Sequence, residues 1–142
     1  MDVMEKEEKI ILAQTMKKKK IQLLIPLVII AALLIYCFVI FISTDYIATW
    51  KHYLAFGLFI ALVILFIKNF KAAVIATGVF LLLGTFNLLA LTKEINASWI
   101  KIFSIDTPHI NLLSFGLTCL YFILNFDTLI NIYLDYKERK EK

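Results

Sequence analysis

The sequence predicts an all-α integral membrane protein, a four-helix up-down bundle with both termini in the cytoplasm and an interfacial segment in its third (outer) loop. Of its 142 residues, 61% are hydrophobic and 18% are charged, against about 45–50% and about 25% in a typical soluble domain. Apolar stretches that could cross a bilayer recur four times along the chain. This composition excludes a soluble monomer, a disordered chain and, with only two cysteines, a disulfide-stapled secreted scaffold.

The first two expected spans cover residues 21–43 and 50–68. A helix needs about 20 mostly apolar residues to cross a hydrocarbon core of about 30 Å, and residues 21–43 contain no charge. The uninterrupted apolar run of the second span is only 53–67. We therefore expect Trp50 and Lys68 to lie at the interfaces, and a re-entrant segment is the alternative for so short a run.

The third and fourth expected spans cover residues 71–92 and 110–134. The connection between them contains the stretch 99–105, which is too apolar for a solvated loop and too short to cross. We expect this stretch to lie along the outer membrane surface or to plug the bundle. Together the spans form one transmembrane domain, residues 21–134, and Pro108 turns the chain into its last helix.

Lysine and arginine are distributed asymmetrically among the segments that flank these spans. Six precede the first span, two lie in the 68–71 turn and four follow the last span, whereas the other two connections hold three altogether. The positive-inside rule then places both basic ends, residues 1–20 and 135–142, in the cytoplasm with the 68–71 turn. Fourteen lysines against one arginine, with many isoleucines, favour a bacterial chain in the cytoplasmic (inner) membrane.

The N-terminal segment ends in a run of four lysines that follows Met16. We expect residues 1–15 to form a short cytoplasmic helix or an extension that is not always made. The lysine run and the two tryptophans are predicted to fix orientation by contacting lipid headgroups and interfaces. These residues are Lys17, Lys18, Lys19, Lys20, Trp50 and Trp99.

Small residues are the expected packing positions, because helices in lipid associate through close approach and polar contacts. The second span offers Gly57 and Ala61, four residues apart. The third offers small and polar residues that share one face at helical spacing: Ala73, Thr77, Gly84 and Asn87.

Polar residues recur along the fourth span at intervals of three and four, which places them on one helical face. They are Asn111, Ser114, Thr118, Tyr121, Asn125 and Thr128, hereafter the polar stripe. The stripe is interpreted either as interhelical hydrogen bonding toward the third span or as the wall of a hydrated path or polar ligand pocket, because hydroxyls and amides serve both uses.

Asp127 is the one acid within a predicted span, and an acid there indicates function by default because it is costly to insert. Three interpretations stay open. It could form an ion pair with Lys68 or Lys71 at the inner end, with Asn131 hydrogen-bonding to it one turn later. It could serve as a proton- or cation-coupling site together with Asn125 and Asn131. It could instead contact another subunit.

His52 and His109 both fall at outer helix starts near carboxylates, so they are weak candidates for a transition-metal or haem site. Their spacing matches no known motif, and we predict no metal and no cofactor. Cys37 and Cys119 fall at similar depths and could approach one another, but a Cys-x-x-Cys pair is lacking in the sequence. No catalytic motif occurs, so we expect no enzyme.

The preferred functional hypothesis is an interaction protein, an accessory or self-associating subunit of a membrane complex. Its expected partners are the lipid bilayer and either copies of itself or other membrane subunits, and no nucleic acid. The alternative is a small transporter or oligomeric pore that uses the polar stripe, Asn87, Asn131 and Asp127. A second alternative is a metal or cofactor carrier that uses His52 and His109.

Overall fold

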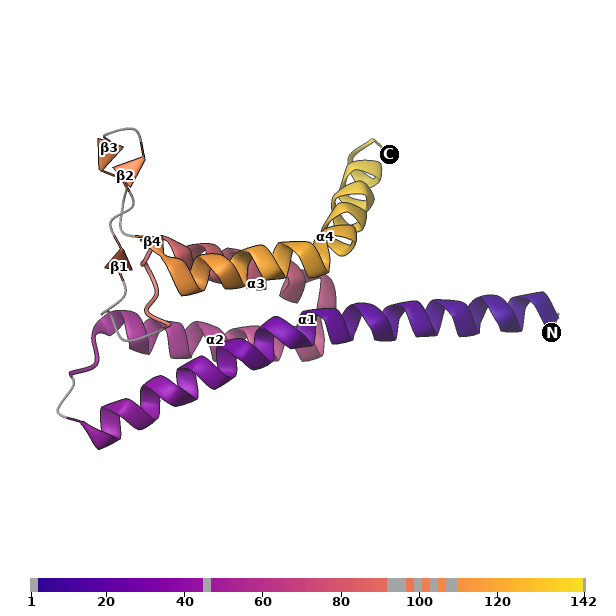
Figure 1. The fold of residues 1–142 in the computed structure, drawn as a ribbon. Helices are drawn as coiled ribbons and strands as arrows, with labels where there is room; N and C mark the ends of the chain where they lie inside the picture. Colours follow the sequence, from indigo (N-terminus) through magenta and orange to yellow (C-terminus); the bar gives the residue numbers. More distant parts are fainter. Residues whose placement is uncertain are drawn as a thin grey trace.

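The chain folds into four helices that lie side by side (Figure 1). The computed structural model describes residues 3–44, 47–91, 97–98, 101–102, 105–106 and 110–141. The helices are α1 (Val3–Ser43), α2 (Trp50–Lys68), α3 (Phe70–Thr85) and α4 (Leu112–Lys140). Three of them, α1, α2 and α4, are long and apolar enough to cross a membrane, whereas α3 has 16 residues. The chain is therefore nearly all helical and indicates a membrane protein.

α1 joins the expected N-terminal segment and the first span into one helix of 41 residues. Its first part projects beyond the bundle (Figure 1), and the side chains of residues 7–18 are exposed. Its second half packs against the other helices along one face, formed by Leu23, Leu27, Ile30 and Leu34. Pro26 lies inside the helix and is buried. A proline is tolerated in a membrane helix when its surroundings satisfy the freed backbone group.

A single residue, Asn69, connects α2 to α3. Its backbone N–H donates to the carbonyl of Leu65 at 2.7 Å, which closes α2. Its side-chain oxygen accepts from the N–H of Ala72 at 3.2 Å, which caps the start of α3. A connection this short forces the two helices to run antiparallel as neighbours. We call this end of the bundle the Asn69 end, and the opposite end, where α4 begins, the Asn111 end.

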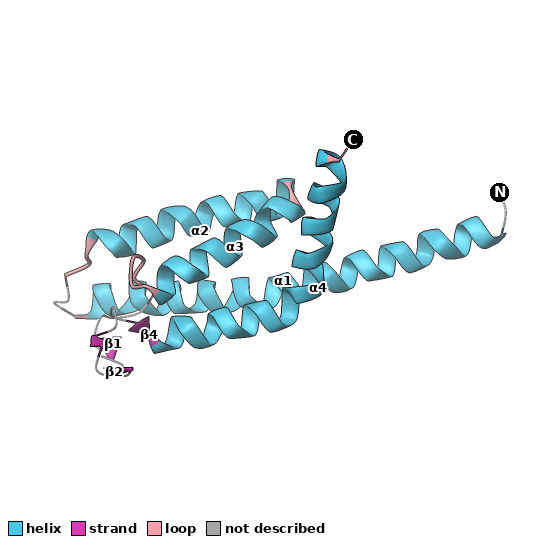
Figure 2. Ribbon diagram, turned by 90° about the horizontal axis from the view of Figure 1, so that it is seen from above, coloured by secondary structure: helices cyan, strands magenta, loops and turns pink. Residues whose placement is uncertain are grey.

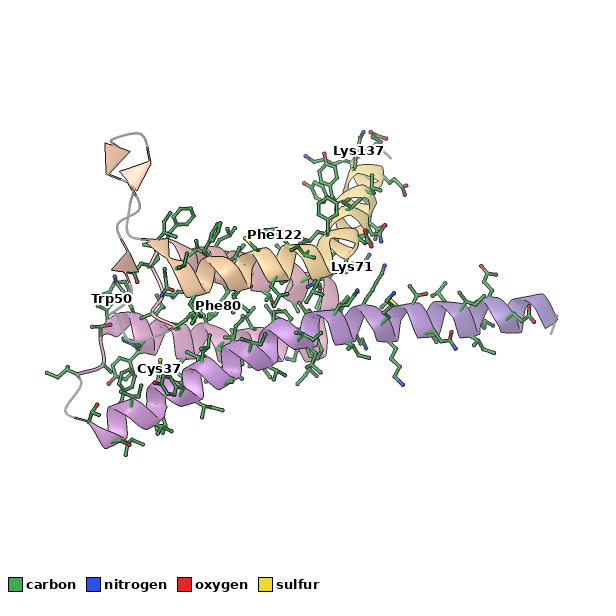
Figure 3. All side chains as sticks on the ribbon, viewed as in Figure 1. Cys37, Trp50, Lys71, Phe80, Phe122 and Lys137 are labelled. Carbon is green, nitrogen blue, oxygen red and sulfur yellow. The ribbon has the colours of Figure 1, made fainter. Side chains whose placement is uncertain are left out.

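α3 is the central helix of the bundle. It packs against α4 and α2 and touches α1, while α1 packs mainly on α4. Figure 2, seen from above, shows the four helices as a bundle with both chain termini toward the Asn69 end. The buried side of α3 includes large apolar residues such as Phe80 and Leu81, and Phe80 points into the bundle interior (Figure 3). The helix that is shortest by length is thus the one most covered by its neighbours.

The third expected span is wrong in its extent, because α3 ends at Thr85 rather than near residue 92. Asn87 adopts a left-handed backbone conformation, with φ 57°. The N–H of Leu88 then donates to the carbonyl of Leu83 at 2.9 Å, and that of Asn87 to Gly84 at 3.1 Å. These bonds form a Schellman motif, in which asparagine tolerates the left-handed position.

The apolar residues after this turn pack back into the bundle. Leu89, Ala90 and Leu91 are all buried, and the Cys37 thiol of α1 donates to the carbonyl of Leu91 at 3.3 Å. Judged by hydropathy alone, these residues would continue α3, although the backbone has already turned at Asn87. The stretch 89–91 therefore closes the Asn111 end from within.

The connection between α3 and α4 contains two short antiparallel strand pairs, which the all-α prediction did not include. β1 (Ala97–Ser98) pairs with β4 (Ile110–Asn111), and β2 (Lys101–Ile102) pairs with β3 (Ile105–Asp106). The predictions for Trp99, Pro108 and His109 lie outside the described residues. α4 then runs past the expected end at residue 134 to Lys140, and its last part, which carries Lys137, turns away from the bundle axis (Figures 1 and 3).

Candidate functional site

The six residues of the polar stripe all lie on the buried face of α4, which packs against α3. Ser114, Tyr121 and Asn125 are fully buried, and the exposed fraction of the other three side chains stays below one tenth. Successive stripe residues therefore line the most extensive helix contact in the molecule. Their hydrogen bonds bear on the two interpretations of the stripe.

Thr118 makes the central polar contact between α3 and α4. Its hydroxyl lies 2.9 Å from the hydroxyl of Thr85 and 3.2 Å from the carbonyl oxygen of Leu81, both on α3. It also lies 2.8 Å from the carbonyl oxygen of Ser114, one turn earlier on its own helix. The Thr118 hydroxyl has a single proton, which these three neighbouring oxygens share as acceptors. The Thr85 hydroxyl in turn donates to the carbonyl of Leu81.

Tyr121 makes the second polar contact, nearer the Asn69 end. Its hydroxyl donates to the carbonyl of Val74 on α3 at 2.5 Å. The ring lies over Gly78, where an added Cβ would meet the ring carbon Cε1 at 3.2 Å. A glycine at this position allows the ring to lie against the α3 backbone. Gly78 is not among the predicted packing residues. Its position directly after the predicted packing residue Thr77 could have indicated a close helix contact.

The remaining stripe residues are satisfied locally or only in part. The Asn111 side chain accepts from the N–H groups of Leu113 and Ser114 at 3.1 and 3.2 Å, so it caps the start of α4. The Asn125 amide donates to the carbonyl of Tyr121 at 3.2 Å. Within the described residues, the Asn125 side-chain oxygen and the Ser114 hydroxyl have no hydrogen-bond partner.

The predicted packing residues divide into two groups. Ala73, Thr77 and Gly84 are buried on α3, and a Cβ on Gly84 would meet Leu91 at 3.0 Å. Gly57 and Ala61, by contrast, are exposed on α2, and nothing lies within 4 Å of a Cβ added to Gly57. The expected packing role of Gly57 within the bundle is wrong, because its side of α2 faces outward. Ala61, although exposed, lines a pocket between α2 and α3 together with Leu58 and Phe80. Asn87 lies beyond the end of α3 and serves as its left-handed cap.

Asp127 lies on the side of α4 opposite the polar stripe. It is exposed, whereas Asn125 and Thr128 beside it are buried. In the described part of the chain Asp127 has no ion pair and no hydrogen bond. Ile123, one turn before it, and Phe126, adjacent to it, are apolar and exposed to 77% and 59%. Asn131, one turn after it, is exposed and polar.

The expected ion pair between Asp127 and the α2–α3 turn is wrong, because Lys71 pairs with Asp135 instead. Eight residues, about 12 Å along the helix, separate Asp127 from Asp135. The hydrogen bond and the positive charge of Lys71 lower the pKa of Asp135. Asn131, expected beside Asp127, is exposed and lines a pocket with Asp135 and Lys71.

His52 has a structural role at the start of α2. Its Nδ1 accepts from the N–H of Thr49 at 3.3 Å and lies 2.9 Å from the Thr49 hydroxyl, which completes a helix cap. The ring is buried and packs edge-on against Phe41 at 4.9 Å between centroids. No group of three metal-ligating side chains occurs among the described residues, and His109 lies outside them.

The two cysteines do not face one another. Cys37 is buried in the bundle, whereas Cys119 lies on the exposed face of α4, and both are free thiols. The anticipated approach of the two is therefore wrong. Cys119 instead shares the outward side of α4 with Ile123, one turn closer to Asp127.

No known protein family, curated protein or solved structure matches this chain. The site must therefore be interpreted from its own chemistry. That chemistry comprises a polar stripe whose interhelical hydrogen bonds end on α3, and an isolated acid on the opposite face of the same helix.

Proposed function

We propose that the chain is an interaction subunit of a membrane complex, which binds another membrane-spanning helix through the exposed face of α4 around Asp127. The observation that carries the proposal is the placement of Asp127, an acid within a membrane helix that is exposed and lacks a partner in the described residues. An acid at the centre of a span costs about 2.5–3.5 kcal/mol to insert. Asp127 lies nearer the end of the expected span, about 10 Å along the helix from residue 134, so its cost is smaller. A partner helix would compensate this cost.

The chemistry of Asp127 limits what the partner presents. Facing lipid tails, a carboxyl group needs a cation or a hydrogen-bond donor at its own depth. Ile123 and Phe126 supply apolar contact area on either side of it. A second copy of this chain qualifies as the partner if the two carboxyl groups share a proton or if Asn131 of one copy donates to Asp127 of the other.

The polar stripe supports the same class of function. Its interhelical hydrogen bonds join α4 to α3, as expected for residues that hold helices together. A transport path that combines the stripe with Asp127 has less support, because these groups lie on opposite sides of α4. The proposed setting is the bacterial cytoplasmic membrane, with the Asn69 end and both termini in the cytoplasm, since that end carries most of the basic residues.

The test compares two acid-to-amide variants, Asp127→Asn and Glu138→Gln. Glu138 is exposed on the last part of α4, beyond the expected span, so its loss controls for the change in charge. The complex is purified from native membranes in mild detergent, and its mass and subunit stoichiometry are measured. We expect Asp127→Asn to weaken association at least about tenfold, equivalent to about 1.4 kcal/mol, and Glu138→Gln to leave it unchanged.

Two outcomes would overturn the proposal. One is a wild-type chain that purifies as a monomer without a stoichiometric partner. The other is ion or solute flux in proteoliposomes of the pure monomer that is abolished by Asp127→Asn, which would favour the transporter alternative.

A further inference from the structure

A pocket of about 550 Å³ lies at the Asn69 end, between α1, the α2–α3 turn and α4. This volume falls in the range of small-ligand pockets. Four charged side chains line it: Lys19 from α1, Lys68 from the end of α2, Lys71 from the first turn of α3 and Asp135 from α4. Figure 3 shows Lys71 at the place where α1 leaves the bundle and α4 turns away.

The charge of the pocket is positive, with three lysines against one acid. Lys71 is paired with Asp135, and neither Lys19 nor Lys68 has an ion-pair partner within the described residues. The charge of Lys19 reaches Asp135 in the same pocket, because it adds to the charges of Lys71 and Arg139 in lowering the pKa of Asp135. Two ammonium groups from different helices therefore face one cavity without a matching acid.

Hydrogen-bond donors suited to an anion line the same cavity. α3 begins there at Phe70, after its cap Asn69. Asn69 caps the N–H of Ala72, which leaves the N–H groups of Phe70 and Lys71 without a partner within that helix. The positive end of the helix dipole favours negative charge at this position. The hydroxyl of Thr128 and the amide of Asn131 line the opposite wall. These groups match the several acceptor oxygens of a phosphate.

Apolar side chains complete the pocket and indicate the source of the phosphate. Met16, Phe70 and Ile132 lie beside the charged groups. We infer that this pocket binds the phosphate group of an anionic ligand, with a phospholipid headgroup as the favoured source and a soluble phosphate compound as the other. Basic pockets at the ends of membrane helices suit anionic headgroups, whose acyl chains continue along the apolar surface. The inference does not depend on the association surface around Asp127.

The test measures lipid binding to the full-length protein by native mass spectrometry, with phosphatidylglycerol and phosphatidylcholine as probes. The pocket variant is the double substitution Lys19→Gln and Lys68→Gln. The matched control is Lys137→Gln with Lys140→Gln, which removes the same charge from exposed positions on the last part of α4, outside the pocket lining and outside the lysine run 17–20. A third arm adds inorganic phosphate as a competitor.

We expect a phosphatidylglycerol adduct in the wild type that exceeds the phosphatidylcholine adduct. It should weaken about fivefold for each pocket lysine removed, or about 25-fold for both, and stay within about twofold in the control. Retention of the adduct against millimolar inorganic phosphate supports the lipid source, whereas its displacement by phosphate supports a soluble phosphate compound. Equal losses in the pocket and control variants, or no preference for the anionic lipid, would overturn the inference.

Discussion

The two faces of α4 use polar residues in opposite ways. On the buried face, Thr118 and Tyr121 reach the α3 hydroxyl of Thr85 and the α3 carbonyls of Leu81 and Val74. On the exposed face Asp127 lies beside the apolar side chains Ile123 and Phe126 and has no partner in the described chain. Polarity inside the bundle joins α4 to α3, whereas the acid on the outer side is the basis of the proposed partner.

The largest expected effect on the buried face comes from Gly78→Val. The new side chain would collide with the Tyr121 ring, since even a Cβ lies 3.2 Å from it, and would disturb the hydrogen bond to Val74. We expect the free energy of unfolding to fall by about 1–3 kcal/mol, measured by denaturant titration in mixed micelles. Gly57→Val is the control, because nothing lies within 4 Å of its Cβ. Equal losses in both variants would contradict the assigned contact.

Removing the central hydroxyl of the stripe should have a smaller effect. Thr118→Val keeps the shape of the side chain but breaks its contacts with Leu81 and Thr85, so we expect a loss of about 0.5–1.7 kcal/mol in the same titration. Thr15→Val is the control. The Thr15 hydroxyl also donates to a carbonyl four residues earlier, but on the exposed, projecting half of α1. A loss of stability in Thr15→Val as large as that in Thr118→Val would mean that the contact with α3 contributes nothing.

A contact could be predicted from the sequence where it follows from residue spacing within one helix. It could not be predicted where it depends on how separate segments pack. The spacing of the polar stripe placed six side chains on one face, because helical periodicity is a property of the sequence itself. The end of α3 was not predictable from hydropathy, because Leu89 to Leu91 are apolar yet follow a turn centred on Asn87. The residue composition of the segment is the same whether it continues a span or folds back.

The partners of charged residues were equally hard to predict. α4 carries three acids, Asp127, Asp135 and Glu138. Which of them Lys71 meets depends on how the helices pack and on the turn in the last part of α4. Sequence spacing likewise placed Gly57 and Ala61 on one face of α2. Whether that face turns inward is decided by the one-residue connection at Asn69 and by the packing of α2 on α3.

The smallest expected effect concerns the ion pair between Lys71 and Asp135. Because the pKa of Asp135 lies below its ordinary value of 3.8, its contribution to stability is fully present above that value. The contribution is lost as the pH falls through the lower pKa of the folded state. We expect Asp135→Asn to reduce slightly the stability difference between about pH 6 and about pH 3. In the Lys71→Gln background the same substitution should have a smaller effect, which the charges of Arg139 and Lys19 leave. An undiminished effect would contradict the pairing.

The most direct test of the association surface is photo-crosslinking in native membranes from two matched isoleucines. A photoreactive residue replaces either Ile123, on the Asp127 face of α4, or Ile35, on the outer face of α1; these side chains are exposed to 77% and 63%. We predict a discrete protein adduct from position 123 that disappears in the Asp127→Asn background, and none from position 35. No protein adduct from position 123, or adducts of equal yield from both positions, would contradict the proposed function.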